Sequence, residues 1–493
     1  MTLHVTNTLT GEREPFEPLD PNAVTLYYCG LTVSDDAHLG HARSWVHVDV
    51  MHRWLSHLGY DVRHVENVTD VNEKIVARIG EVGADERAVA RHFIERVLAD
   101  MRALNLKRAE VYPRVTEHIP EIVSLIESLL EKGYAYESNG SVYFDVTSYE
   151  EYGKLSNQRI EELEAQDDAD ERGEKRHPAD FALWKGGPVA PDEIADHRRP
   201  GVGPLDEPAG ETWESPWGAG RPGWHIECSA MSMTHLGETF DVHVAGQDLV
   251  FPHNENEIAQ SEAATGKPFA RYWLHVRLLE TEGEKMSTSL GNFATVRDLV
   301  DEYGTNPVRM FLLSTAYNNV ATYSETTFEE GIERWKRVER GYERAVEAAD
   351  SADARTKVED DALRSAIDDA REAFVAGMND DFNTREAITA VLSIATAVNR
   401  HVDGTGEYDY RGLCRAIDYF EQFGGDVLGF SFAGGTDGTV HLAHELVAFV
   451  LELRERERDA GNYDRADELR ADLEGLGVEV QDTDEGPTYR IPE

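Results

Sequence analysis

Short apolar segments alternate with longer segments of helical periodicity over the first hundred residues. Residues 24–28 and 62–68 are short, apolar and rich in β-branched and aromatic side chains, which is typical of buried strands. Between them, residues 42–58 have the three-and-four spacing of a helix, and this spacing returns in residues 71–79 and 88–104. A strand, a helix and a second strand in this order predict an α/β domain whose parallel sheet has right-handed crossovers.

This alternation stops where a helical pattern over residues 119–132 precedes two apolar runs. The runs are separated by Asn139 and Gly140, a dipeptide typical of a two-residue hairpin turn. Two later segments lack apolar periodicity, because residues 161–174 are densely acidic and residues 186–210 are rich in Pro, Gly and Asp. We interpret both segments as solvated insertions.

Two further strands, at residues 241–245 and 272–279, complete the predicted sheet. From residue 295 the chain is mostly helical, and its apolar spacing suits a helix bundle. The predicted helices span residues 328–349, 360–378, 385–402, 412–423, 442–456 and 463–476. We therefore divide the chain into the first half of the α/β domain (1–115), a connective insertion (116–214), the second half (215–280), a loop and contact region (281–330), a helical bundle (331–435) and a C-terminal domain (436–493).

Acidic side chains far outnumber basic ones. The chain has 94 Asp and Glu against 48 Lys and Arg, a formal net charge of −46. Because such a chain repels itself in dilute buffer, we expect a cytoplasm of very high salt, where the Debye length is about 3 Å or less. A hydrophobic content of 41 % and an aromatic content of 9 % argue against a disordered acidic protein or an acidic mimic of a binding partner. No apolar run approaches the roughly 18–20 residues of a membrane helix, and the N-terminus has no signal pattern.

Cysteine is rare, and two of the three copies lie where they could bind a metal. The odd set Cys29, Cys228 and Cys414 argues against a disulfide framework, and Cys414 fits a helix core. Cys228 precedes His253 and Glu257, which are four residues apart and so share one helix face. Cys29, at the end of the first predicted strand, is the best candidate for the fourth ligand of tetrahedral zinc. The alternative is a position left open for substrate.

A histidine motif lies where the first strand gives way to a helix. His38 and His41 are three residues apart, so both imidazoles can donate to phosphate oxygens beside the helix N-terminus. Gly40 between them lets a flat base approach the backbone. Two chance surface histidines are the alternative, but the position after a buried strand favours a nucleotide site.

A second nucleotide motif lies in a loop at residues 285–289, Lys-Met-Ser-Thr-Ser. Lys285, with the hydroxyls of Ser287 and Ser289, suits a pyrophosphate whose charge grows as a bond breaks. Asp248 follows a predicted strand, where a carboxylate can accept ribose hydroxyls. The alternatives are a solvated loop and a turn aspartate.

Together these motifs resemble those of the cysteinyl-tRNA synthetases, a family of class I aminoacyl-tRNA synthetases. The resemblance rests on residues 7–10, 14–16, 28–30, 38–43, 67–70, 180–185, 215–218, 220–231, 251–261, 285–293, 380–384 and 466–470. It implies an α/β fold with a Rossmann-like class I synthetase catalytic domain and an inserted connective domain. An α-helical bundle and a small C-terminal anticodon-reading domain would follow.

Carried over position by position, the resemblance implies roles for the motif residues. The implied catalytic residues are His38, His41 and Lys285. The implied ATP contacts are these three with Gly40, Asp248, Ser287 and Ser289. The amino acid would be contacted by Gly30, Thr32, Thr69 and Trp224. The implied ligands of one Zn²⁺ per chain are Cys29, Cys228, His253 and Glu257.

The resemblance also implies a reaction and its partners. L-Cysteine and ATP with Mg²⁺ would give cysteinyl-adenylate and pyrophosphate, and the acyl group would pass to the terminal adenosine of tRNA(Cys). Zinc binds a thiolate far better than a hydroxyl, so it would select cysteine against serine without editing. A cytoplasmic monomer without a membrane partner is implied as well.

The sequence departs from the family at several positions. Thr288 replaces the second lysine of the loop motif, so Lys285 alone would carry the triphosphate charge. Leu31 and Ser34 stand where the family has Pro and Tyr. Residues 186–210 are longer than the family usually shows.

Three other functions remain as alternatives. A ligase of the same fold would join cysteine to an amino-sugar, and the C-terminal half argues against it. A zinc hydrolase with Glu255 or Glu257 as base would explain neither nucleotide motif. An RNA-binding relic would be expected to have lost ligands or histidines, which are all present.

The net charge opposes tRNA binding, so affinity must come from local cations. Arg334, Lys336, Arg337 and Arg340 form the candidate cluster. Because counterion release contributes little in high salt, we expect tRNA affinity to vary weakly with salt.

Overall fold

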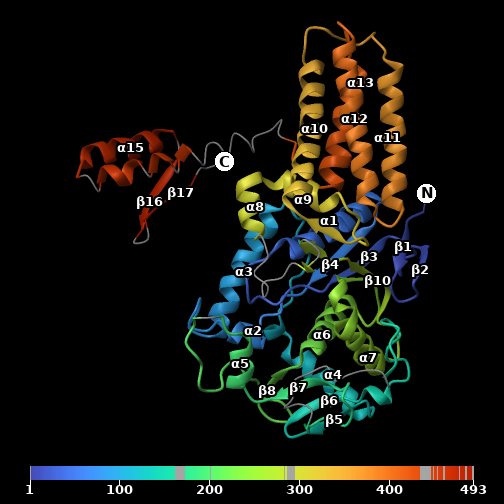
Figure 1. Cartoon of the computed structure of the whole chain (residues 1–493), viewed down its shortest axis with the longest axis vertical. Coiled ribbons are helices and arrows are strands. Elements are labelled where there is room, and N and C mark those ends of the chain that lie inside the picture. Colours follow the sequence, from blue (N-terminus) through green and yellow to red (C-terminus); the bar gives the residue numbers. More distant parts are fainter. Residues whose placement is uncertain are drawn as a thin grey trace. The chain divides into compact units, whose positions relative to one another are not determined.

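The computed structural model describes most of the chain. The described residues are 2–160, 173–199, 201–281, 284–285, 295–432 and 446–490, the last range without 448, 452, 459–460, 477 and 484–485. The chain forms two compact units, Met1–Phe430 and Ser431–Glu493 (Figure 1).

A four-stranded parallel sheet forms the middle layer of the first unit. Its strands, in the spatial order β10-β9-β3-β4, are β3 (Ala23–Tyr28), β4 (Asp61–Glu66), β9 (Phe240–Gly246) and β10 (Ala270–Val276). These are the four strands that the apolar runs predict. Since β4 and β9 flank β3 on opposite sides, the strand order reverses between β3 and β9. In such sheets ligands bind beyond the carboxyl ends of the strands at this point.

Helices pack on this sheet and begin where capping groups are available. The sheet contacts include α1 (Leu39–His57) and α6 (Trp224–Leu236), and further helices of this region are α3 (Glu86–Ala103) and α7 (Glu255–Thr265). Helix α1 begins three residues before the predicted range. The reason is His38, whose Nδ1 accepts a hydrogen bond from the Gly40 N–H at 3.0 Å and so satisfies one of the first helical donors.

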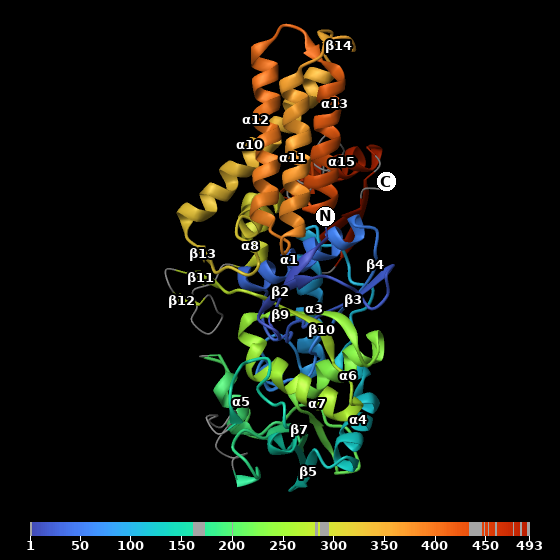
Figure 2. The ribbon, with the colours of Figure 1, turned by 90° about the vertical axis from the view of Figure 1, so that its right-hand side faces the viewer.

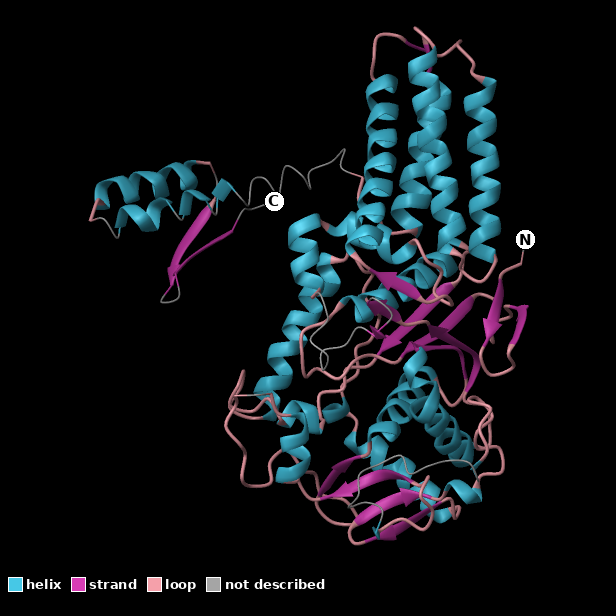
Figure 3. Cartoon of the chain, viewed as in Figure 1, coloured by secondary structure: helices cyan, strands magenta, loops and turns pink. Residues whose placement is uncertain are grey.

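An antiparallel sheet is inserted between β4 and β9. It contains β5 (Ala135–Ser138), β6 (Ser141–Phe144), β7 (Phe181–Gly186) and β8 (Gly220–Pro222), and α4 (Ile119–Glu131) precedes it. Figure 3 shows its strands at the end of the first unit remote from the long helices. The predicted hairpin turn is confirmed, because Asn139 and Gly140 both have positive φ, 50° and 85°, as a type I′ turn requires.

The prediction of a solvated insertion over residues 186–210 was wrong. This segment contains α5 (Pro191–His197), and its Val189 and Ile194 are buried against the residues of α2 (Glu73–Val76). These two apolar side chains pack the segment onto the domain. Of the acidic run, residues 161–172 lie outside the described residues.

A small three-stranded sheet lies between the parallel-sheet region and the helices that follow. Its strands are β11 (Leu279–Thr281), β12 (Glu284–Lys285) and β13 (Ala321–Tyr323), and α8 (Val296–Tyr303) and α9 (Thr305–Leu313) lie between β12 and β13. Of the predicted motif at 285–289, only the backbone of Lys285 is described. The other residues of this motif, including Ser287 and Ser289, lie outside the described residues.

Four helices form the predicted bundle, and Figures 1 and 2 show them side by side. They are α10 (Glu325–Ala349), α11 (Asp361–Asn379), α12 (Thr384–Gly404) and α13 (Tyr410–Tyr419). Arg309 of α9, which is fully buried, donates to the Asp49 carboxylate of α1 at 2.7 Å and to the Leu428 carbonyl at 2.6 Å. This arginine therefore ties the chain after the bundle to the sheet domain.

The second unit is small. It contains α15 (Tyr463–Gly475) and the antiparallel pair β16 (Glu479–Thr483) and β17 (Gly486–Arg490). Its core is formed by Val447, Leu451, Leu473, Val478 and Val480.

Candidate active site and metal centre

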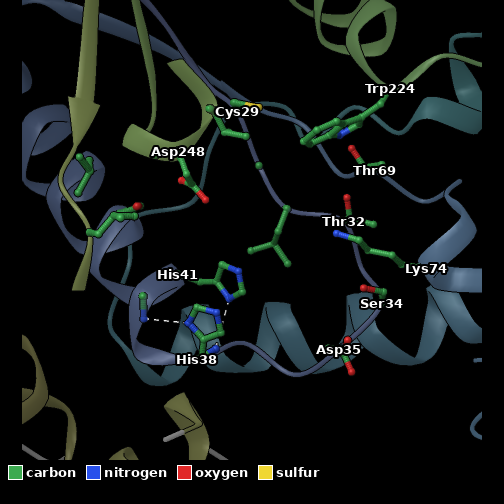
Figure 4. Close-up of a pocket in the computed structure, with 18 of the residues that line it drawn as sticks. Cys29, Thr32, Ser34, Asp35, His38, His41, Thr69, Lys74, Trp224 and Asp248 are labelled. Atoms are coloured by element: carbon green, nitrogen blue, oxygen red, sulfur yellow. Dashed lines mark hydrogen bonds between the residues drawn. The ribbon is translucent and has the colours of Figure 1, made fainter. Parts of the chain in front are cut away.

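A cavity of about 680 Å³ opens beyond the carboxyl ends of β3 and β9. Its volume falls in the range of small-molecule sites. The loop after β3, the first turn of α1, the residues after β9 and the start of α6 all line it (Figure 4). The cavity therefore occupies the crevice at which the strand order reverses.

Four side chains with metal-binding atoms converge beside this cavity. The ligand atoms of Cys29, Cys228, His253 and Glu257 lie within 4.8 Å of one another, and all four residues are buried. Cys29 Sγ is 3.6 Å from Cys228 Sγ and 3.5 Å from His253 Nε2. Glu257 Oε1 is 3.3 Å from the same Nε2. A single metal ion could be held by these four groups.

Neighbouring imidazoles determine the charge state of Glu257 in this cluster. Burial alone would raise the pKa of Glu257, but His243 and His253 outweigh it and hold that pKa well below its ordinary value. Burial disfavours the charged form of His253, yet Glu257 outweighs burial and raises the pKa of His253 to about 10. The pKa of the Cys228 thiol is raised well above its ordinary value by its hydrogen bond with Cys29 and by burial. A bound cation would reverse this effect and favour the thiolates.

Two further histidines support the cluster and were missed by the sequence analysis. His243 of β9 lies 3.0 Å from Glu257 Oε2, and His225 of α6 has its Nδ1 3.0 Å from Nδ1 of His253. Since the partner of one ring nitrogen fixes the orientation of the other, His225 aims His253 Nε2 at the cluster. The available signal was weak: His225 precedes Cys228 by three residues, on the same helix face.

The two motif histidines are stacked at the start of α1. The ring centroids of His38 and His41 are 3.8 Å apart, and the planes differ by 21°. His38 Nδ1 accepts from Gly40 N–H, and His41 Nδ1 accepts from His38 N–H at 3.3 Å. Both rings therefore carry their proton on Nε2, as the hydrogen-bond network assigns it. A Cβ at Gly40 would lie 2.7 Å from the His38 ring, so any larger residue at this position would force the ring to move.

The loop after β3 pairs with the loop after β4. Thr32 forms an isolated bridge with Thr69, and the Gly30 N–H donates to Asn67 Oδ1 at 2.8 Å. A Cβ at Gly30 would lie 1.9 Å from the Asn67 carbonyl oxygen, so only glycine permits this approach. Gly30, Thr32 and Thr69 all line the cavity, and Figure 4 shows Thr32 and Thr69 on the same side of it.

Trp224 and Asp248 lie at opposite sides of the cavity (Figure 4). Trp224 is 41 % exposed, and its ring centroid is 4.4 Å from that of His253. Asp248 follows β9 and lines the cavity. The side chain of Lys285, and with it the position of its ammonium group relative to the cavity, lies outside what the structure describes.

The sequence analysis also missed a group of cations that line the cavity. Lys74 lies in α2 and Arg78 lies two residues after its end, whereas His197, Arg198 and Arg199 come from the segment predicted as solvated. The missed signal was the pair Arg198-Arg199 in a chain with few basic residues.

Two family descriptions match the chain. The description "tRNA synthetases class I (C) catalytic domain" matches residues 15–333, which is well over half of the chain. The description "DALR domain" matches residues 373–433, within the bundle and the segment after it.

Similar proteins cover the full length. A cysteine–tRNA ligase from Haloarcula marismortui is 67 % identical over 493 residues, all of both chains. A cysteine–tRNA ligase from Thermococcus gammatolerans is 41 % identical over 99 % of both chains. The chain therefore belongs to the cysteine–tRNA ligases, a family of class I aminoacyl-tRNA synthetases.

Solved structures agree on the fold. A Mycobacterium tuberculosis methionyl-tRNA synthetase in complex with methionyl-adenylate superposes with a TM-score of 0.58 at 17 % identity. The superposition covers 82 % of this chain and 89 % of that one. Among the described residues, no helix combines the length and apolar character needed to cross a membrane.

Proposed function

We propose that this chain activates L-cysteine with Mg·ATP to cysteinyl-adenylate and then transfers cysteine to the 3′-terminal adenosine of tRNA(Cys). The observation that carries the proposal is the buried Cys₂–His–Glu cluster at the cavity that also holds the paired histidines of α1. A substrate thiol and a nucleotide would then meet in one cavity. The names of the full-length relatives support the same assignment.

The donor set fits zinc. Two thiols, one imidazole and one carboxylate are its usual ligands, with bonds of about 2.0–2.3 Å. The edge of a tetrahedron is about 1.6 times the bond length, or roughly 3.3–3.7 Å for such bonds. The three distances of 3.3, 3.5 and 3.6 Å agree with this. Glu257 Oε1 has no hydrogen-bond donor among the described residues, as expected of a metal ligand.

Zinc bound here would supply a soft Lewis acid that holds a substrate thiolate and does not hold a serine hydroxyl comparably. The protein supplies the rest of the amino acid site. Trp224 covers the side-chain end, and Thr69 with the Gly30–Thr32 loop offers polar groups for the α-amino group. Selection by a thiolate explains how one site could discriminate without an editing domain.

The adenylation step would rest on charge and position. The α-carboxylate of cysteine attacks the α-phosphorus of ATP, and the bond to pyrophosphate breaks. His38 and His41, each protonated on Nε2, donate to phosphate oxygens beside the N-terminus of α1. Lys285, which lies in β12 by its backbone, would neutralise charge on the departing pyrophosphate. Asp248 would accept the ribose hydroxyls.

A hydrolase is disfavoured by the surroundings of its candidate base. Glu255 accepts hydrogen bonds from the backbone N–H groups of Gly153, Leu155 and Ser156 at 2.8–3.0 Å, so its carboxylate is committed to holding a loop. Glu257 is better used as a metal ligand. A ligase that joins cysteine to an amino-sugar would not need the DALR match over residues 373–433.

The tRNA-binding cluster on α10 is weaker than its sequence indicates. Arg334 is paired with Glu330 at 3.0 Å, and Lys336 with Glu333 at 2.9 Å. Arg337 and Arg340 have no ion pair among the described residues. We propose that these two arginines are the residues of this helix that contact the phosphate backbone of the tRNA. The net charge of −46 fits the high-salt setting of the relatives from Haloarcula marismortui and Halobacterium salinarum.

The test is transfer of labelled cysteine to tRNA in molar KCl with zinc, beside cysteine-dependent ATP–pyrophosphate exchange. We expect both activities with cysteine and neither with serine. Exchange without charging would favour the amino-sugar ligase. Neither activity in a folded sample would overturn the proposal.

A further inference from the structure

The wall of the cavity that carries Lys74 is built from two segments that are distant in sequence. Helix α2 follows β4, whereas α5 and the arginines after it lie more than a hundred residues later. The basic residues on this wall are Lys74, Arg78, His197, Arg198 and Arg199. In a chain with a net charge of −46, such a group of cations at one cavity requires a physical reason.

The guanidinium groups hold the two segments together. Arg78 donates to Asp35 Oδ2 at 3.0 Å and to the His197 carbonyl at 2.7 Å. Arg198 donates to the carbonyls of Ala77 at 3.0 Å and Ile79 at 3.1 Å. These bonds run in both directions between the α2 region and the later segment.

Arg199 completes this clamp and joins it to the histidine motif. It forms ion pairs with Asp35 and Glu81, and Asp35 lies three residues before His38. Asp35 thus accepts from both Arg78 and Arg199. All three arginines of the wall are engaged by protein groups, so they position the wall and leave ligand binding to another residue.

Lys74 is different from these arginines. Its ammonium group has no ion pair or hydrogen bond with the described residues, and Figure 4 shows it directed into the cavity beside Thr32. Among the described cavity-lining Lys and Arg residues, only Arg277 shares this lack of a partner, and it follows β10 on another wall. Figure 4 also shows Lys74 on the side away from Asp248, where the ATP ribose is proposed to bind. An anion other than ATP must therefore be considered for Lys74.

We propose that Lys74 binds the last phosphodiester of the tRNA and that the arginine clamp holds the wall in place for it. This inference rests on the proposed function, because transfer requires the terminal adenosine to reach the adenylate in this same cavity. The hydroxyl of that adenosine attacks the carbonyl carbon of the adenylate, and AMP leaves. The phosphodiester on its 5′ side enters with it as an anion, and Lys74 offers it a charge-assisted hydrogen bond.

The position of Lys74 explains why a lysine serves here. A terminal nucleotide enters and leaves in every cycle, and a flexible ammonium can follow it, whereas the arginines are fixed by two or three hydrogen bonds each. The contact lies at a cavity wall, so it should be screened less by salt than a contact on an open surface. This would let a strongly acidic enzyme hold a polyanion in molar salt.

The first experiment separates the two half-reactions in the full-length enzyme with zinc in molar KCl. For Lys74→Gln we expect single-turnover transfer from preformed adenylate to fall about tenfold more than ATP–pyrophosphate exchange does, as for the loss of one charged hydrogen bond. Lys74→Arg should recover most of the transfer rate. The matched control is Lys267→Gln, which removes an exposed lysine paired with Glu238 outside the cavity and should change neither rate.

The second experiment tests the contact itself. A tRNA with a neutral methylphosphonate as its last internucleotide linkage should slow transfer by the wild-type enzyme about as much as Lys74→Gln does. If the two groups touch, the variant with the modified tRNA should be no slower than either single change. Multiplying losses would overturn the contact.

The remaining outcomes are equally decisive. Equal losses in exchange and transfer would assign Lys74 to ATP or to the amino acid and overturn the inference. An unchanged transfer rate would overturn it as well. Charging by the wild-type enzyme in the same assay reports separately on the proposed function, so failure of one claim is not mistaken for failure of the other.

Discussion

Two walls of the cavity, one formed by the metal-binding cluster and one that carries Lys74, differ in how deeply their charged groups are buried. Cys29, Cys228, His253 and Glu257 are almost completely buried in the sheet domain, and imidazoles set their charge. The Lys74 wall is held by hydrogen bonds to backbone carbonyls and by ion pairs, of which those of Arg199, 41 % exposed, are the most accessible to solvent. The buried wall suits a choice between two small side chains, and the rim wall suits a large anion that binds and leaves.

This difference has a consequence for how each wall responds to conditions. Buried groups respond to pH and to loss of a partner, because an unsatisfied buried donor or charge costs several kcal/mol. Exposed ion pairs contribute about 0–1 kcal/mol each and weaken as salt rises. The two walls should therefore differ in how they respond to pH, to loss of a partner and to salt.

Removal of one metal ligand should have the largest effect. Cys228→Ala should lose bound zinc and lower kcat/KM for cysteine in ATP–pyrophosphate exchange by more than about a hundredfold. The reason is that loss of a residue that only hydrogen-bonds to a metal ligand already lowers metal affinity or activity by about 10- to 100-fold. Cys414→Ala is the matched control, because Cys414 lies outside the cluster and should keep both properties. Full zinc content with a near wild-type kcat/KM in Cys228→Ala would refute the buried wall as a metal site.

The buried carboxyl group of Glu66 should make the stability of the sheet domain depend on pH. Burial raises the pKa of Glu66 to about 8, and the hydrogen bond from Trp45 Nε1 at 3.0 Å offsets only part of this. Between the unfolded pKa of about 4.3 and the folded one, the native chain keeps a proton that the unfolded chain releases, so stability falls as pH rises through this window. Glu66→Gln removes this loss.

Urea unfolding in molar KCl at pH 5 and pH 8 would measure this effect. We expect Glu66→Gln to gain about 1–3 kcal/mol relative to wild type between the two pH values, at about 1.4 kcal/mol per pKa unit. An equal difference between variant and wild type at both pH values would contradict the prediction.

Gly40→Ala should damage the histidine pair without weakening the fold. The added Cβ would lie 2.7 Å from the His38 ring, so the ring must move, while alanine in a helix is intrinsically more stable than glycine. We expect about a tenfold lower exchange rate with unchanged or higher Tm, since small displacements of catalytic groups are costly. Gly404→Ala, where no atom lies within 4 Å of the added Cβ, should leave the rate unchanged. A normal rate in Gly40→Ala would argue against the stacked pair.

Arg199→Gln should have the smallest effect, and salt should modulate it. Loss of its ion pairs with Asp35 and Glu81 should slow aminoacyl transfer about two- to threefold at the lowest salt at which the enzyme stays folded, and less in molar KCl. Arg415→Gln removes a similarly exposed arginine, which is paired with Asp368 in the bundle, and should not affect transfer. An effect of Arg199→Gln that is independent of salt would show that this wall is not held by exposed charges.

The sequence by itself determined the elements whose signals are local. The strand ending at Tyr28, the turn at Asn139 and Gly140, and the four helices of the bundle follow from periodicity and turn chemistry, which act between near neighbours in the chain. The enzyme class was predicted correctly as well, because the motifs resemble those of the family to which the full-length relatives belong. For this reason the fold class was predicted correctly from the order of the elements and their motifs.

Only the tertiary structure decided which groups surround the motif residues. Cys29 meets Cys228 although 199 residues separate them, and His243 of β9 reaches Glu257 of α7. Residues 186–210 have a loop-like composition, yet burial of Val189 and Ile194 brings Arg198 and Arg199 to the cavity. Contacts of this kind depend on the free energy of packing segments that are distant in sequence. Local periodicity of hydrophobic residues does not indicate which distant segments pack together.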